Sequence, residues 1–199
     1  LISNVIPVDT VISYLTDKFK LFDEVDMYGV DDNAGTLNTE YPIDKATLGF
    51  GQGASINTYQ LMQAASAIFG DGTMLKPYVV EKIVDPNTGE TVYQGQTEEV
   101  GEPISAETAK ELQGLLERVV TDPNGTAQHY KMTDVTMMAK TGTGEVSTDG
   151  KYGKYYTNSI LAAAPADDPQ IIIYYAFESE QYKNYDTSYF QDVVREALN

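Results

Sequence analysis

The residues of this sequence best suited to chemistry form one short run, Lys140-Thr141-Gly142-Thr143. A lysine ammonium beside hydroxyl groups offers charge and hydrogen bonds to an anion, and a glycine lets a peptide lie close to the backbone. The run ends the apolar, β-prone residues 136–143, so we expect it on a strand. A phosphate-binding loop needs a glycine several residues before its lysine, and none stands there, so nucleotide chemistry is excluded.

A second block has a turn with the sequence Gly51-Gln52-Gly53 that leads into a helical pattern over residues 58–69. An Asp71-Gly72 break and a strand-like segment with Pro77 follow it. The turn glycines are expected to shape the backbone, not to catalyse. His129, the single histidine, lies in a polar segment, where a solvent-facing loop position is expected.

Taken together, the two blocks resemble the transpeptidase domain of the penicillin-binding proteins, more closely the class B, monofunctional type. Residues 140–143 match that family's Lys-[Ser/Thr]-Gly-Thr motif. The segment Ser3-Asn4-Val5 is similar to the end of its Ser-Ser-Asn motif, with Ile2 where the first serine would stand. The resemblance implies catalytic roles for Lys140 and Asn4 and substrate-binding roles for Thr141, Gly142, Thr143 and Glu145.

The nucleophile that the resemblance requires is not found in this chain. Family members form an acyl-enzyme on the serine of a Ser-x-x-Lys motif, and no serine here has a lysine three residues on. That motif precedes Ser-x-Asn in the family. We therefore expect residues 1–199 to be the C-terminal part of a single transpeptidase domain that depends on a missing N-terminal half-domain or partner chain.

The function implied by the resemblance is peptidoglycan D,D-transpeptidation, which cross-links cell-wall stem peptides and is inhibited by β-lactam antibiotics. It implies a place on the extracytoplasmic face of a bacterial membrane, reached through an N-terminal anchor absent from this chain. Two alternatives remain open. One is a carboxypeptidase, β-lactamase or antibiotic sensor of the same fold, and the other is a non-catalytic module, which Ile2 would favour.

Composition excludes several other classes. With 30 acidic and 13 basic residues the formal net charge is −17, so the surface repels a phosphate backbone and no nucleic-acid partner is expected. The absence of cysteine and the single histidine argue against disulfides and a thiolate or histidine-clustered metal site. We expect neither a metal nor a cofactor.

The elements that would position these residues follow from periodicity and turn signals. The pattern predicts an α+β fold, an antiparallel sheet covered by helices. The resemblance implies that this is part of the fold shared by penicillin-binding proteins and serine β-lactamases. The expected elements are a helix over 7–22 with a break near Thr16, a surface loop over 23–45, helices over 58–69, 105–120 and 188–198, a hairpin of 75–84 and 90–94, and strands over 136–143, 159–164 and 170–177.

Overall fold

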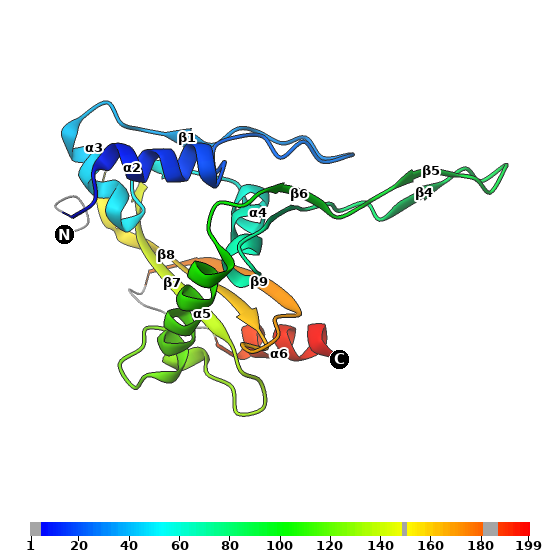
Figure 1. The fold of residues 1–199 in the computed structure, drawn as a ribbon. Coiled ribbons are helices and arrows are strands. Elements are labelled where there is room, and N and C mark those ends of the chain that lie inside the picture. The colour runs from blue at the N-terminus through cyan, green and yellow to red at the C-terminus, as the bar shows by residue number, and fades with distance from the viewer. Residues whose placement is uncertain (1–4, 149–150, 181–186) are drawn as a thin grey trace. The chain divides into compact units, whose positions relative to one another are not determined.

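The computed structural model describes residues 5–148, 151–180 and 187–199. The chain divides into two compact units, one extending to Ala106 and the other starting at Glu107 (Figure 1). The strand pairs of both units are antiparallel. Within the described ranges, no helix is both long enough and apolar enough to cross a bilayer.

In the first unit, helix α2 (Val8–Ser13) continues into the π-helical turn η1 (Tyr14–Lys18). The expected break near Thr16 therefore falls inside the wider turn. The Thr16 hydroxyl donates a hydrogen bond to the Ile12 carbonyl oxygen at 3.0 Å. Such back-bonding bends helices, which accounts for the irregular turn at this place.

Helix α4 (Thr58–Phe69) has the predicted bounds. Asn57 caps its first turn, because its side-chain oxygen accepts from the Gln60 amide nitrogen at 2.9 Å, while Gln60 Oε1 accepts from the Asn57 nitrogen at 2.9 Å. This reciprocal pair is a capping box. Asn57 also donates to the Asn33 carbonyl oxygen at 3.0 Å, so α4 holds the preceding loop segment.

The prediction of a loop over residues 23–45 was wrong in part. Strand β1 (Thr36–Leu37) lies there and pairs with β2 (Ala54–Ser55). Helix α3 (Pro42–Thr47) follows, continued by the 3-10 turn η2 (Leu48–Phe50). Pro42 suits a first helical position, and the Asp44 carboxylate accepts from the Tyr41 amide at 2.9 Å.

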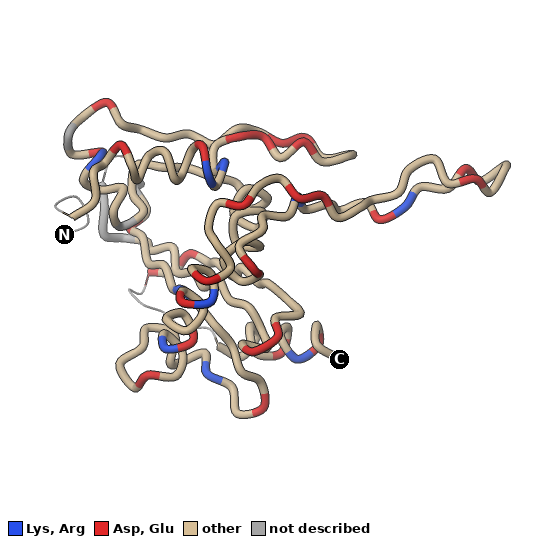
Figure 2. The backbone as a smooth tube through the Cα atoms, viewed as in Figure 1, with Lys and Arg blue, Asp and Glu red and all other residues tan. Residues whose placement is uncertain are grey.

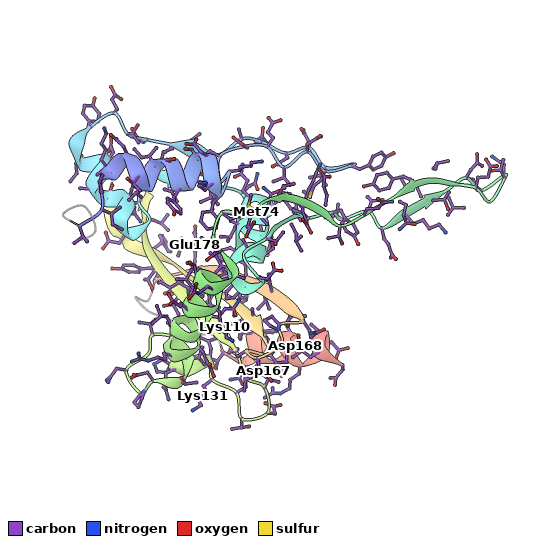
Figure 3. The ribbon with its side chains drawn as sticks, in the orientation of Figure 1. Met74, Lys110, Lys131, Asp167, Asp168 and Glu178 are labelled. Carbon is purple, nitrogen blue, oxygen red and sulfur yellow. The ribbon has the colours of Figure 1, made fainter. Side chains whose placement is uncertain are left out.

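The predicted hairpin is confirmed for strands β4 (Lys82–Val84) and β5 (Thr91–Gln94). The start of the expected strand is a separate element, β3 (Met74–Lys76), which pairs with β6 (Glu98–Gly101). Figure 3 labels Met74, whose side chain is fully buried at the first position of β3. The hairpin is therefore joined to its unit by a second strand pair at its base.

The second unit contains a three-stranded sheet with helices. Its elements are α5 (Ala106–Thr121), the 3-10 turn η3 (Gln128–Tyr130), β7 (Met138–Thr148), β8 (Lys151–Ala164), β9 (Ile171–Ser179) and α6 (Thr187–Leu198). The strand order is β7-β8-β9. All three strands are longer than the sequence predicted.

Helix α6 covers one face of this sheet. Phe190 and Val194 of α6 pack into a buried cluster with Ala139, Ile160 and Ala162 of β7 and β8. Tyr130 of η3 meets Phe190 edge to face, with ring centroids 5.1 Å apart. The buried cluster therefore holds β7 on the sheet face that α6 covers. The predicted α+β class, with a helix-covered antiparallel sheet, is confirmed.

Candidate active site

The run that carries the chemistry lies near the start of β7, an edge strand of the described sheet. Its residues alternate between the two sheet faces, as strand geometry requires. Thr141 and Thr143 share a face with buried Ala139, whereas Lys140 and Gly142 lie on the other face. The two sets of side chains can therefore act on one ligand only at the exposed edge of β7.

Lys140 supplies the positive charge of this edge. Its side chain is exposed, and its Nζ donates to the Thr141 carbonyl oxygen at 2.7 Å. Among the described residues, no carboxylate lies within ion-pair distance of Lys140. A ligand carboxylate would meet an ammonium that has not already been neutralised.

Thr141 is held by a residue that the sequence analysis missed. Its Oγ1 donates to Thr126 Oγ1 at 2.7 Å, which ties β7 to the loop after α5. That loop turns at Gly125, where an added Cβ would collide with the Val119 carbonyl group. Only glycine fits there, and the turn places Thr126 beside the motif. No sequence pattern marks a threonine 15 residues upstream as a partner of Thr141.

A side chain at Gly142 would press on the hydroxyl of its cross-strand neighbour. Gly142 pairs with Ser159 of β8, and a Cβ added at Gly142 would lie 2.6 Å from Ser159 Oγ. Real Cβ atoms do not come that close to another heavy atom. The missing side chain at Gly142 thus leaves room for Ser159. This adds to the reason expected from the sequence, which was room for a peptide along the strand.

The remaining motif residues continue along the same strand. Thr143 is exposed and pairs with Asn158, and Glu145 is exposed and pairs with Tyr156. The predicted site residues from Lys140 to Glu145 thus follow one another along one edge strand. Asn4 and Ile2 lie outside the described residues, so the role expected of Asn4 stays a prediction.

Each unit has a hollow among its described residues. One of about 410 Å³ lies beside the motif's partner Thr126, and α5 residues Leu115, Arg118 and Val119 also line it. The larger, of about 600 Å³, is confined to the first unit, where Tyr28, Lys76 and Tyr93 belong to its wall. It contains none of the predicted site residues. His129 is exposed in η3, as expected, and lies outside both hollows.

The edge offers an ammonium, two hydroxyls and the unpaired backbone of a strand. An extended peptide can add to such an edge through main-chain hydrogen bonds, while the ammonium and hydroxyls bind a terminal carboxylate. Within the described residues, no cluster of three metal-ligating side chains is found. The arrangement suits recognition of an anionic peptide or an analogue of one.

Comparison with known proteins identifies a family that the chain matches. The family model described as penicillin binding protein transpeptidase domain matches residues 6–199. The chain is 35% identical over 139 residues to stage V sporulation protein D of Bacillus subtilis, covering 69% of this chain and 21% of that protein. It is 29% identical over 133 residues to the probable peptidoglycan D,D-transpeptidase PenA of Neisseria gonorrhoeae, covering 66% of this chain and 21% of that one.

Solved structures show the same fold. Penicillin-binding protein 2X of Streptococcus thermophilus superposes with a TM-score of 0.79 at 26% identity, covering 96% of this chain and 29% of that one. Penicillin-binding protein 2B of Streptococcus pneumoniae gives 0.76 at 24% identity, with coverages of 96% and 32%. The chain thus spans only a minor part of the length of the relatives it matches.

Proposed function

The chain belongs to the penicillin-binding protein transpeptidase domain family, and we propose that it acts as the C-terminal part of a serine-type peptidoglycan D,D-transpeptidase. The observation that carries the proposal is the Lys-Thr-Gly-Thr run on an exposed edge strand, with an ammonium that no described carboxylate neutralises. The nucleophile is proposed to be the serine of a Ser-x-x-Lys motif upstream of Leu1, in the rest of the same domain.

The proposed reaction has two steps. The upstream serine oxygen attacks the carbonyl carbon of the penultimate D-alanine of a stem peptide, and the terminal D-alanine leaves with a proton on its nitrogen. An amine from a neighbouring stem peptide then attacks the ester carbonyl, which forms the cross-linking amide and returns the proton to the serine oxygen. β-Lactams imitate the donor peptide and leave an ester that is slow to break down.

The roles proposed for this chain's residues are supported by their neighbouring places along β7. Lys140, Thr141 and Thr143 bind the donor's terminal carboxylate, and Gly142 leaves room for the peptide. The strand backbone near Thr143 stabilises the carbonyl oxygen as negative charge develops on it. Asn4 is proposed to contact the reacting groups, and Glu145 to line the binding site for the donor peptide along β7.

The partners and location belong to the same proposal. Stem peptides and β-lactams are the ligands, the extracytoplasmic face of the bacterial membrane is the site of action, and an N-terminal anchor provides the attachment. A non-catalytic module of the same family is the second candidate. It is favoured by one observation, Ile2 at the position of the motif serine.

Acylation by benzylpenicillin tests the proposal. We expect the protein with its complete transpeptidase domain to gain the mass of one antibiotic, on a serine upstream of Leu1, and the isolated 199-residue chain to gain none. Folded complete protein without an adduct would favour the non-catalytic module. An adduct on the isolated chain would show that the nucleophile lies within it.

Lys140→Ala tests the role assigned to the lysine. We expect it to lower the acylation rate about 30- to 150-fold, because a charge-assisted contact to the ligand carboxylate, worth about 2–3 kcal/mol, is lost. The thermal midpoint should hardly change, since Lys140 is exposed. Lys110→Ala, at an exposed position of α5, is the matched control (Figure 3). Unchanged acylation of the Lys140 variant would refute the assignment.

A further inference from the structure

One buried polar group beside the motif has no partner. The Oδ1 atom of Asn158 accepts no hydrogen bond, although the residue is only 3% exposed. Its Nδ2 donates to the Tyr156 carbonyl oxygen at 3.4 Å, near the outer limit for a hydrogen bond. Burying an unpaired amide oxygen lowers stability, so packing does not explain why an asparagine stands at position 158.

The register places this amide directly across from Thr143. Residues opposite each other in an antiparallel pair lie on the same face with neighbouring side chains, so Asn158 and Thr143 are within reach of one another. On its other side Asn158 pairs with Phe177, which has no side-chain donor. The diagonal hydroxyl, that of Thr141, already donates to Thr126.

Thr143 has the free hydroxyl that could meet this oxygen. Across the described ranges its side chain makes no hydrogen bond, and it is exposed at the strand edge. We propose that Asn158 is a positioning residue for Thr143. Its side-chain amide hydrogen-bonds the Thr143 hydroxyl and orients that hydroxyl's hydrogen toward the carboxylate of an anionic ligand. This inference rests on the proposed function, in which Thr143 contacts that carboxylate.

The amide is suited to this task because it offers both an acceptor and donors. In the structure Asn158 Oδ1 accepts no hydrogen bond from Thr143, whose hydroxyl can rotate about the Cα–Cβ bond. When a carboxylate arrives, a half-turn of the amide lets Nδ2 donate to Thr143 Oγ1, and the hydroxyl hydrogen is released to the ligand. Among the described residues, the half-turn gives up a single hydrogen bond of the amide, the weak one to the Tyr156 carbonyl oxygen.

Substitution at Asn158 separates positioning from packing. Asn158→Val removes the amide at similar volume and suits a strand. We expect the thermal midpoint to stay level or rise, because an unpaired buried oxygen is removed, while acylation by benzylpenicillin falls about 2- to 10-fold, the usual range for one hydrogen bond. Asn158→Thr retains a hydroxyl that can donate and accept, and should restore most of the rate. Thr157→Val, on the opposite face of β8, is the matched control.

A double-mutant cycle decides whether Asn158 acts through Thr143. In a Thr143→Val background, Asn158→Val should cause no further loss of acylation rate. Equal losses in both backgrounds, or an unchanged rate for Asn158→Val alone, would overturn the inference and leave the proposed function standing. Unaltered complete protein that is not acylated would overturn both together.

Discussion

At the residue scale, the geometry of the motif depends on what lies across the strand from it. Lys140 and Gly142 face Leu161 and Ser159, whereas Thr141 and Thr143 face Ile160 and Asn158. The packed neighbours therefore decide where each hydroxyl can point and how much room a ligand has above Gly142. The proposed contacts of the motif require that β7 and β8 keep this register, because a shift of one residue would turn each side chain to the other face.

The contact between Gly142 and Ser159 predicts a compensating pair of substitutions. Gly142→Ala should lower the free energy of unfolding by about 0.5–1.5 kcal/mol, because the new methyl group would lie 2.6 Å from Ser159 Oγ and would drive that side chain from its rotamer. Ser159→Ala in the same chain should recover at least half of that loss, measured by urea unfolding. A loss that Ser159→Ala does not relieve would place the cause elsewhere.

Single residues show what the sequence could and could not foretell at the site. Lys140 and the three residues after it were predicted to lie on a strand, because an apolar, β-prone run precedes them. Thr126, Ser159 and Asn158 were missed. Their relation to the motif comes from a loop closed at Gly125 and from strand register, and neither is written as a local pattern in the sequence.

At the scale of elements, the best predictions were those with both periodicity and a cap. Helix α4 has the predicted bounds because its apolar stripe starts after Asn57 and stops at Gly70. Helix α3 was missed within an acidic segment, although Pro42 and Asp44 are typical of a helix start. Strand β3 is three residues long, too short for alternation to separate it from β4.

Helix α6 is joined to the segment before β7 by one ion pair. Arg195 donates from Nε to Asp134 Oδ2 at 2.8 Å and from NH2 to Oδ1 at 3.3 Å. The hydrogen bond from Arg195 holds the pKa of the Asp134 carboxyl below its ordinary value. A carboxyl with a lowered pKa in the folded state stabilises the fold above its ordinary pKa of about 3.9, and this stabilisation is lost as pH falls through the lowered value.

Arg195→Leu should therefore reduce thermal stability in a pH-dependent way. At pH 7 we expect a lower midpoint than in the unaltered chain, and the difference should shrink as pH falls below about 3.9 and Asp134 takes up its proton. Arg118→Leu is the control, because Arg118 is more exposed than Arg195 and its nitrogen lies farther from its partner Asp122, at 3.8 Å. If Arg195→Leu lowers the thermal midpoint by the same amount at pH 7 and at pH 2.5, the ion pair with Asp134 does not anchor α6.

At the scale of the whole molecule, the dominant physical fact is a net charge of −17. Acidic positions are distributed along the backbone of both units, and basic positions are few (Figure 2). The proposed donor peptide and benzylpenicillin both carry a carboxylate. Their approach is opposed by the overall field, while Lys140 attracts them only at short range.

Ionic strength should reveal which of these two effects governs encounter. Because salt screens long-range repulsion more than a contact inside a cleft, we expect the second-order rate of acylation by benzylpenicillin to rise between 20 and 300 mM sodium chloride, by about 2- to 5-fold. Ampicillin, a zwitterion near neutral pH, should show a much smaller rise and serves as the control. A benzylpenicillin rate that falls with salt would mean that attraction by Lys140 outweighs the acidic surface from the first approach, and the rest of the domain would then have to supply positive charge around the cleft.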